Sequence, residues 1–172
     1  INHNISVLIS EYRIKKKIRE LAENIEKDYK GRSLTIIFIS NGSILFIADL
    51  IRHISLPLII DGIRAHSYKG IKSSAKIQTL NKPKLDISGH NILLVDDIVD
   101  TAKTISKIIE ILKKLSPAEI KTCVLLDKPS KRLQPFKADF VGFEIPDVFV
   151  VGYGLDYNEY YRNLPYIGYI SF

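Results

Sequence analysis

The chain has 172 residues, of which 46% are hydrophobic and 26% are charged. This length suits one domain with its own core, and this composition is that of an ordinary globular protein, which excludes disordered and fibrous classes. The net charge of +6 is compatible with nucleic acid, a membrane surface or a small polyanion as partner. The single cysteine, Cys123, excludes an internal disulfide, and its apolar run IKTCVLL indicates a buried, inert thiol.

The basic and apolar segments narrow the choice of partner. No segment reaches the roughly 18 consecutive apolar residues of a membrane span, so we expect a cytoplasmic protein with no membrane partner. In the basic stretch RIKKKIRE, Ile14 and Ile18 begin an apolar series at helical spacing, which makes the lysines the solvated side of an amphipathic helix. Because no zinc-finger, RNP or helix-turn-helix pattern is present, a nucleic-acid partner is disfavoured.

The elements predicted along the chain alternate between helices and short apolar strands. The first helix begins at Ser10, whose side chain can cap it, and ends near Tyr29. A strand at 34–40, a helix at 43–54 and a strand at 56–65 follow, and together they form a βαβ unit.

The rest of the chain continues this alternation. Residues 67–74 are polar and lack a period, which is typical of a mobile loop. The next predicted elements are strands at 75–80 and 91–95, a helix at 102–115 and a strand at 119–126. This order predicts an α/β fold with a mainly parallel sheet flanked by helices on both faces. From Phe140 onward, short apolar runs and a tyrosine-rich end would finish one edge of the sheet and cover a site.

One stretch, NILLVDDIVDTAKT at 91–104, places aspartates between a buried strand and a helix. In open α/β sheets ligands bind at the carboxyl ends of strands, and a helix N-terminus offers unpaired N–H groups to a phosphate. Asp96 and Asp97 would repel each other unless hydroxyls or a divalent cation share their site, and a sugar phosphate with Mg²⁺ supplies both. The residues alone leave open a plainer interpretation, in which Asp100 only caps the helix and the other two acids are solvated.

The same stretch resembles a known motif. VDDIVDTAKT is similar to the phosphoribosyl pyrophosphate (PRPP) motif of the type I phosphoribosyltransferases, two acids and two apolar residues followed by Asp-Thr-Gly-x-Thr. The stretch from LLDKPSKR to YIGYIS resembles that of the hypoxanthine-guanine members, so the resemblance covers about residues 5 to 172. It implies a Rossmann-like fold in a single domain over 1–172, with a small hood formed by the chain termini and a mobile loop at 67–76 over the active site.

The resemblance also implies a reaction: the Mg²⁺-dependent transfer of a phosphoribosyl group from PRPP to hypoxanthine or guanine, which yields IMP or GMP and pyrophosphate. A homodimer or homotetramer is expected from the family. Two alternatives stay open, a PRPP-sensing module that binds RNA or DNA without catalysis and a transferase for adenine or a pyrimidine. Lys128 argues against the first and against adenine, because a regulator needs no base-reading lysine and adenine presents an amino group where the lysine would donate.

For the ribose phosphate, the resemblance implies roles along the PRPP motif. Asp96 and Asp97 would bind the ribose hydroxyls and Mg²⁺, and Asp100 would be the general base or acid at purine N7. The 5′-phosphate would be held by the backbone and hydroxyls of Asp100, Thr101, Ala102, Lys103 and Thr104. Ala102 replaces the motif's usual glycine. Its methyl would be tolerated in a helical conformation and would weaken phosphate binding at a positive φ.

For the purine, the resemblance implies roles near the C-terminus. Lys128 would donate to O6, Phe149 would stack on the base, the Val150 backbone would bind its exocyclic edge, and Asp156 would lie beside it and hold Mg²⁺. Without the resemblance, Lys128 would be an ordinary exposed loop lysine, and Phe149 and Val150 a buried strand pair. The tyrosine-rich stretch around them could equally form an interface.

For the pyrophosphate, the implied set is Ser40, Asn41, Gly42 and Arg162. The guanidinium suits it because its donors form a planar fork. The family commonly has Leu-Lys-Gly at 40–42, often with a cis peptide, so here backbone N–H groups remain but the lysine's charge is lost. Ser67 and Tyr68 match a Ser-Tyr pair on the family's mobile loop, whose closure would exclude water, and a plain surface loop is the alternative.

Overall fold

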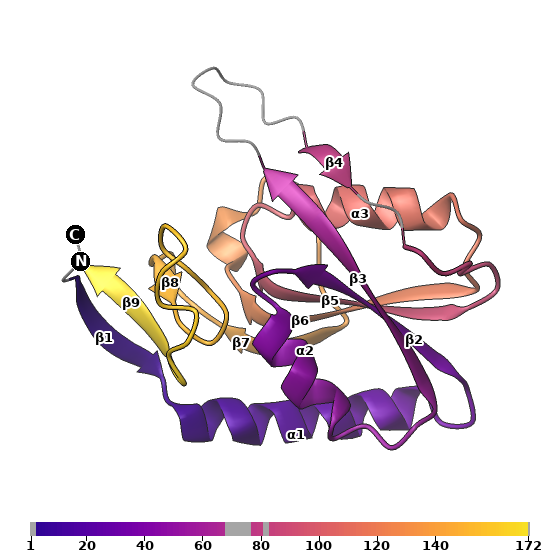
Figure 1. Ribbon diagram of the computed structural model, residues 1–172, viewed down its shortest axis with the longest axis horizontal. Coiled ribbons are helices and arrows are strands. Elements are labelled where there is room, and N and C mark those ends of the chain that lie inside the picture. The colour runs from indigo at the N-terminus through magenta and orange to yellow at the C-terminus, as the bar shows by residue number, and fades with distance from the viewer. Residues whose placement is uncertain (1–2, 68–76, 81–82, 172) are drawn as a thin grey trace.

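A computed structural model describes residues 3–67, 77–80 and 83–171 of the chain. Its centre is a six-stranded sheet in which five strands are parallel and β4 is antiparallel to β3 (Figure 1). In spatial order the strands are β4 (Ile77–Leu80), β3 (Leu58–Ser67), β2 (Leu34–Ser40), β5 (Asn91–Val99), β6 (Glu119–Asp127) and β7 (Phe140–Glu144). The predicted mainly parallel sheet is therefore confirmed.

Helices cover both faces of this sheet. α1 (Glu11–Asp28) and α2 (Ile44–Ile51) pack on one face, and α3 (Lys103–Lys113) packs on the other (Figure 1). Because successive strand residues point to opposite faces, the neighbours Leu93 and Leu94 enter different hydrophobic cores. A strand that is buried on both faces must be apolar along its length, which is why these strands read as unbroken apolar runs.

A second, antiparallel sheet forms the hood that the resemblance implies. Its strands lie in the order β1 (Asn4–Ile9), β9 (Ile167–Ser171) and β8 (Val150–Val151), so both ends of the chain meet there (Figure 1). The sequence does not predict β1, since this strand has little buried surface and its pairing partner, β9, lies at the other end of the chain.

Several boundaries differ from the predictions. α1 begins after Ser10, whose hydroxyl accepts from the Arg13 N–H at 3.4 Å as expected, whereas α2 ends at Ile51 instead of residue 54. β5 continues to Val99 because its backbone stays paired with β6 beyond the apolar run, so Asp96 and Asp97 lie within a strand and not in a turn.

The remaining predictions on fold concern the loop, the cysteine and the membrane. Ser67 is the last residue of β3, and the rest of the predicted loop 67–76, with Tyr68, lies outside the described residues. Cys123 is buried, and its burial raises the pKa of the thiol, as expected for an inert cysteine. In the described parts of the chain, no helix is long and apolar enough to cross a membrane.

Candidate active site

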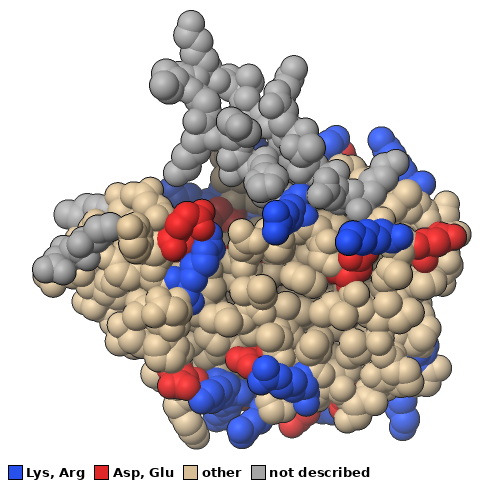
Figure 2. Space-filling model, viewed as in Figure 1, with Lys and Arg blue, Asp and Glu red and all other residues tan. Residues whose placement is uncertain are grey.

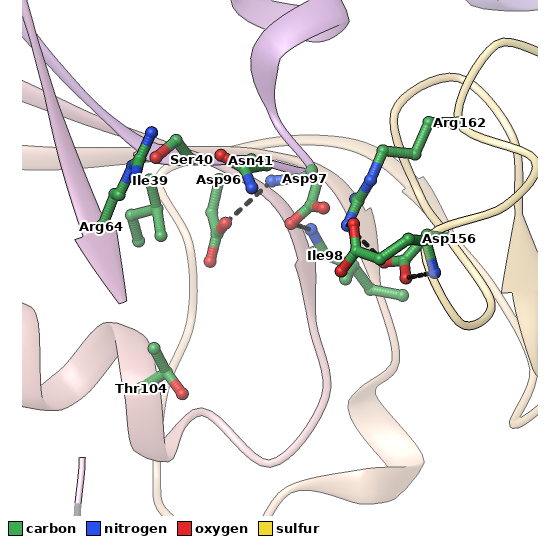
Figure 3. Close-up of a pocket in the computed structure, with 12 residues that line it drawn as sticks. Ile39, Ser40, Asn41, Arg64, Asp96, Asp97, Ile98, Thr104, Asp156 and Arg162 are labelled. Atoms are coloured by element: carbon green, nitrogen blue, oxygen red, sulfur yellow. Dashed lines mark hydrogen bonds and ion pairs between the residues drawn. The ribbon is translucent and has the colours of Figure 1, made fainter. Parts of the chain in front are cut away.

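In the acid pair near the end of β5, Asp96 is buried and Asp97 is half-buried. Asp96 is only 7% exposed, and its Oδ1 accepts from the Asp97 N–H at 3.0 Å, while Asp97 Oδ1 accepts from the Ile98 N–H at 2.8 Å. Burial raises the pKa of both carboxyls, and the charge of Asp97 raises that of Asp96 further. The pair faces a cavity of about 440 Å³ at the carboxyl ends of the strands (Figure 3). Two adjacent acids of raised pKa favour a ligand that brings hydroxyls or a cation.

Two glycines allow three distant segments to meet at this cavity. A Cβ on Gly42 would lie 1.6 Å from Asp97 Oδ2, and a Cβ on Gly154 would lie 2.1 Å from the Gly42 carbonyl oxygen. The Gly42 backbone therefore packs against the Asp97 side chain, and the Gly154 backbone packs against the Gly42 carbonyl. These contacts bring together the loop after β2, the end of β5 and the loop after β8. The peptide bond between Ser40 and Asn41 is cis. The predicted residues 40–42 thus lie directly against Asp97 and line the same cavity.

The loop between β8 and β9 supplies the opposite wall. Arg162 Nη2 forms ion pairs with Asp156 Oδ1 and with Glu159 Oε2, each at 2.9 Å, and Nη1 donates to the Gly154 carbonyl at 2.8 Å. All three charged side chains line the cavity, and Figure 3 shows Asp156 and Arg162 to one side of the β5 acids. The two residues predicted for Mg²⁺ and pyrophosphate, Asp156 and Arg162, are therefore bound to each other.

The segment 99–104, named the PRPP loop here after the motif that it resembles, lines a second hollow of about 150 Å³ between β5 and α3. Thr101, Ala102 and Thr104 line it, whereas Lys103 is exposed and does not. Ala102 is the N-cap of α3 at φ 66°, and its own side chain forms no capping hydrogen bond. The Thr101 hydroxyl accepts from the Lys103 N–H at 3.4 Å, and the N-terminus of α3 lies at a hollow that could hold an anion. Ala102 shows the positive φ for which its methyl was expected to weaken phosphate binding.

Lys128 is a buried residue and not the exposed loop lysine of the plainer interpretation. It follows β6, is 6% exposed, and places Nζ 3.5 Å from Asp100 Oδ1. Its N–H donates to the Val99 carbonyl at 2.9 Å, which fixes the two loops side by side. Phe149 is 44% exposed just before β8, and its ring meets Tyr157 edge to face at 5.5 Å, whereas Val150 is buried.

Three further charged residues at the site, Arg132, Arg64 and Glu159, are not predicted from the sequence. Arg132 forms a buried ion pair with Asp127 and donates to the carbonyls of Val99 at 3.0 Å and Asp100 at 2.6 Å. It lies inside the quoted stretch LLDKPSKR, and a basic residue so close to a strand-end acid was the available signal. Arg64 and Glu159 line the large cavity, and their positions depend on strand register and loop path, which the sequence does not show.

Comparisons with known proteins agree with this geometry. The family model for the phosphoribosyl transferase domain matches residues 9–158. The chain is 45% identical to the hypoxanthine phosphoribosyltransferase of Buchnera aphidicola subsp. Schizaphis graminum over 100% of this chain and 99% of that protein. It is 44% identical to the hypoxanthine-guanine phosphoribosyltransferase of Bacillus subtilis over 98% of this chain and 94% of that protein.

Solved structures show the same likeness. A crystal structure of a hypoxanthine-guanine phosphoribosyltransferase from Bacillus anthracis superposes with a TM-score of 0.93 at 40% identity, covering 99% of this chain and 100% of that one. Both the sequence and the fold therefore match over their full extent. The chain belongs to the phosphoribosyltransferase family and is an enzyme of its hypoxanthine-guanine group.

Proposed function

We propose that this enzyme transfers the phosphoribosyl group of PRPP to hypoxanthine or guanine, with Mg²⁺, and releases pyrophosphate. The observation that carries the proposal is the buried Lys128 ammonium held 3.5 Å from Asp100, beside the PRPP loop. In a 6-oxopurine, O6 and N7 lie on one edge of the ring. A lysine donor and a carboxylate side by side suit these two atoms together, and adenine lacks the acceptor at position 6.

In the proposed reaction Lys128 donates to O6 and Asp100 accepts the proton of N7. The N9 lone pair forms the bond to C1′, and the electrons of the breaking C1′–O bond leave with pyrophosphate. The N7 proton ends on Asp100, which is nearly half exposed and can release it. A positioned proton-transfer group of this kind is worth roughly 10²–10⁴-fold in rate. Phe149, with the Val150 backbone, would hold the base between them.

The ribose phosphate would occupy both hollows. The 5′-phosphate would lie at the N-terminus of α3, where N–H groups and the helix dipole favour an anion. Its contacts would be the backbone and hydroxyls of Asp100, Thr101, Ala102, Lys103 and Thr104. The ribose hydroxyls would donate to Asp96 and Asp97, in addition to the backbone N–H groups of Asp97 and Ile98 from which these carboxylates already accept.

The carboxylates of the large cavity fit Mg²⁺ as a shared ligand. Asp96, Asp97 and Asp156 line that cavity with hard oxygen donors, which Mg²⁺ prefers. Among the residues that the structure describes, no three His, Cys, Asp or Glu side chains are grouped to hold a metal by themselves. The ion would thus need substrate oxygens and water as well. When bound, Mg²⁺ would neutralise the charge that develops on the departing pyrophosphate.

The pyrophosphate would lie against the loop after β2. Ser40, Asn41 and Gly42 would offer backbone N–H groups, and Arg162 would contact it from the opposite wall. Closure of a loop that carries Ser67 and Tyr68 would exclude water from the reacting C1′.

The positive charge of the chain does not require nucleic acid. On α1, Lys15 pairs with Glu11 and Lys17 with Glu20, each at 2.5 Å. Figure 2 shows acidic side chains interspersed with the basic ones along the lower edge of the molecule, where α1 lies in the matching view of Figure 1. Mixed charges of this kind make a soluble surface and not a basic stripe.

The test is turnover of PRPP and Mg²⁺ with hypoxanthine, guanine, xanthine and adenine. We expect nucleotide with hypoxanthine or guanine and none with adenine, and no product from any 6-oxopurine would refute the proposal. Asp100→Asn should lower kcat by roughly 10²–10⁴-fold and leave PRPP affinity largely unchanged, because the ribose and phosphate contacts stay in place. An unchanged kcat would exclude the proton-transfer role.

A further inference from the structure

The end of the cavity where pyrophosphate would lie lacks a positive charge that the family usually has there. Asn41, where the resemblance leads one to expect lysine, is neutral. The cavity is lined by the carboxyls Asp96, Asp97, Asp156 and Glu159. A pyrophosphate brought to such a wall needs a cation from the protein in addition to any metal ion, since like charges repel at this range.

Arg162 is largely engaged elsewhere. Its guanidinium is shared by Asp156, Glu159 and the Gly154 carbonyl, all within 2.9 Å. To bind pyrophosphate it would have to exchange one of these partners. A second cationic side chain, that of Arg64, also lines the cavity.

Arg64 lies beside the loop that lost its lysine. It sits near the carboxyl end of β3, and the parallel register of β2 and β3 places it opposite Ser40. Ser40 Oγ donates to the Ile63 carbonyl at 3.3 Å, which ties the start of the loop to this part of β3. Figure 3 shows the Arg64 side chain running alongside Ser40, with the two β5 aspartates between it and Arg162.

Arg64 is also available for a ligand. Its side chain is exposed, and within the described parts of the chain no hydrogen bond or ion pair engages its guanidinium. An exposed arginine that lines a cavity with four acids, and pairs with none of them within the described residues, is placed to receive an anion. Its planar fork can bind two phosphate oxygens at once, which a compact ammonium cannot.

We propose that Arg64 is a second pyrophosphate-binding cation of this enzyme, in addition to Arg162, and takes the place of the lysine absent at position 41. The inference rests on the proposed function, because it assumes that PRPP is the substrate. It predicts that Arg64 contributes to the affinity for PRPP and pyrophosphate and does not contribute to the affinity for the nucleotide product.

The experiment compares Arg64→Gln with Arg19→Gln, an exposed arginine on α1 whose loss changes the net charge equally. Arg64→Gln should raise the KM for PRPP and the dissociation constant of Mg²⁺-pyrophosphate by about tenfold or more, since a charge-assisted contact is lost. The dissociation constant of IMP, which has no pyrophosphate, should not change. Arg19→Gln should alter none of these values. Equal PRPP and pyrophosphate affinities in Arg64→Gln and wild type would overturn the inference.

A second substitution gives the inference a rescue test. Adding Asn41→Lys to Arg64→Gln should restore most of the lost pyrophosphate affinity, because it returns a cation to the same wall. Failure of this rescue, with IMP affinity intact, would show that Arg64 acts by some means other than its charge at this position and would overturn the inference. Pyrophosphate binding is measured by calorimetry without purine, so an inactive wild type would refute the proposed function independently of Arg64.

Discussion

At the scale of single residues, Ala102 is the position where sequence and conformation conflict. Its φ of 66° lies in the left-handed region, where a Cβ costs about 1–2 kcal/mol. The methyl is 4% exposed and packs in the core under α3, which offsets part of that cost. This balance explains how alanine can occupy a position that usually takes glycine.

Enlarging this side chain should upset the balance. We expect Ala102→Val to lower the free energy of unfolding by about 2 kcal/mol or more, because a β-branched residue tolerates positive φ poorly and the site is already filled. Ala48→Val, in the interior of α2, should cost at most about 1 kcal/mol. Chemical denaturation measures both. A similar cost for the two variants would contradict the role of φ.

The charge on Asp96 should lower the stability of the fold and raise the affinity for PRPP. Its pKa in the folded chain is raised, first by burial and then by Asp97. Ionising Asp96 therefore costs more free energy in the folded chain than in the unfolded chain. This lowers the stability of the fold: the loss is absent below about pH 4, grows as the pH rises, and is complete once Asp96 has ionised in the folded chain.

Asp96→Asn removes that penalty and keeps the oxygen that accepts from Asp97. Without PRPP and Mg²⁺, we expect its melting temperature at pH 7 to exceed that of the wild type by a few degrees, and the difference to shrink toward pH 4. PRPP affinity should fall. Melting curves at both pH values decide the point, and a variant less stable than wild type at pH 7 would disprove it.

At the scale of elements, Arg132 ties together the turn after β6 and the PRPP loop. Its guanidinium bonds to Asp127 and to two carbonyls of the PRPP loop, while Lys128 donates its N–H to one of the same carbonyls. The distance between Lys128 and Asp100, on which the proposed chemistry depends, is thus set by a residue that we do not place in contact with substrate.

Substitutions at Arg132 should distinguish its effect on fold stability from its effect on the placement of Lys128 and Asp100. Arg132→Gln should lower the free energy of unfolding by about 3 kcal/mol, because it leaves Asp127 buried without its partner. Adding Asp127→Asn should recover much of this loss. It should not recover kcat/KM for hypoxanthine, which we expect to stay at least about tenfold low, since the loops remain untied. Lys131→Gln, an exposed neighbour paired with Asp147, is the control and should change neither value.

The elements that the sequence predicts well are those whose burial leaves a simple pattern. β2 matches its prediction, Leu34–Ser40, since both of its faces are covered and the run is apolar throughout. β5 is longer than predicted because its run of apolar residues ends at Val95 while its backbone pairing with β6 continues. β1 is exposed along much of its length, so it has no strong pattern, and its partner lies at the other end of the chain.

At the scale of the whole molecule, the candidate site lies where sheet and hood meet. Motif resemblance could point to Asp100 and Lys128 separately, but their separation depends on tertiary contacts. Arg64 was beyond prediction, since only the register of β3 on β2 brings it to the cavity. Gly154, in the loop after β8, lies against the carbonyl of Gly42, which itself packs on Asp97.

This contact gives a prediction with a close internal control. Gly154 has φ +98° and a Cβ there would lie 2.1 Å from the Gly42 carbonyl oxygen, whereas Gly31 has φ +76° and nothing within 4 Å of the same position. Gly31→Ala should cost only the strain of a Cβ at positive φ, about 1–2 kcal/mol of stability. Gly154→Ala adds a collision with backbone that cannot move without displacing Asp97.

We therefore expect Gly154→Ala to cost clearly more stability than Gly31→Ala, and to raise the KM for PRPP where Gly31→Ala leaves it unchanged. Denaturation and steady-state kinetics on the two variants measure this. If both lose the same stability and both keep the wild-type KM, the hood does not hold the pyrophosphate loop in place. If the KM rises only for Gly154→Ala, the site depends on hood and sheet together, because the collision displaces the loop that carries Asn41 and the carboxylate of Asp97 at once.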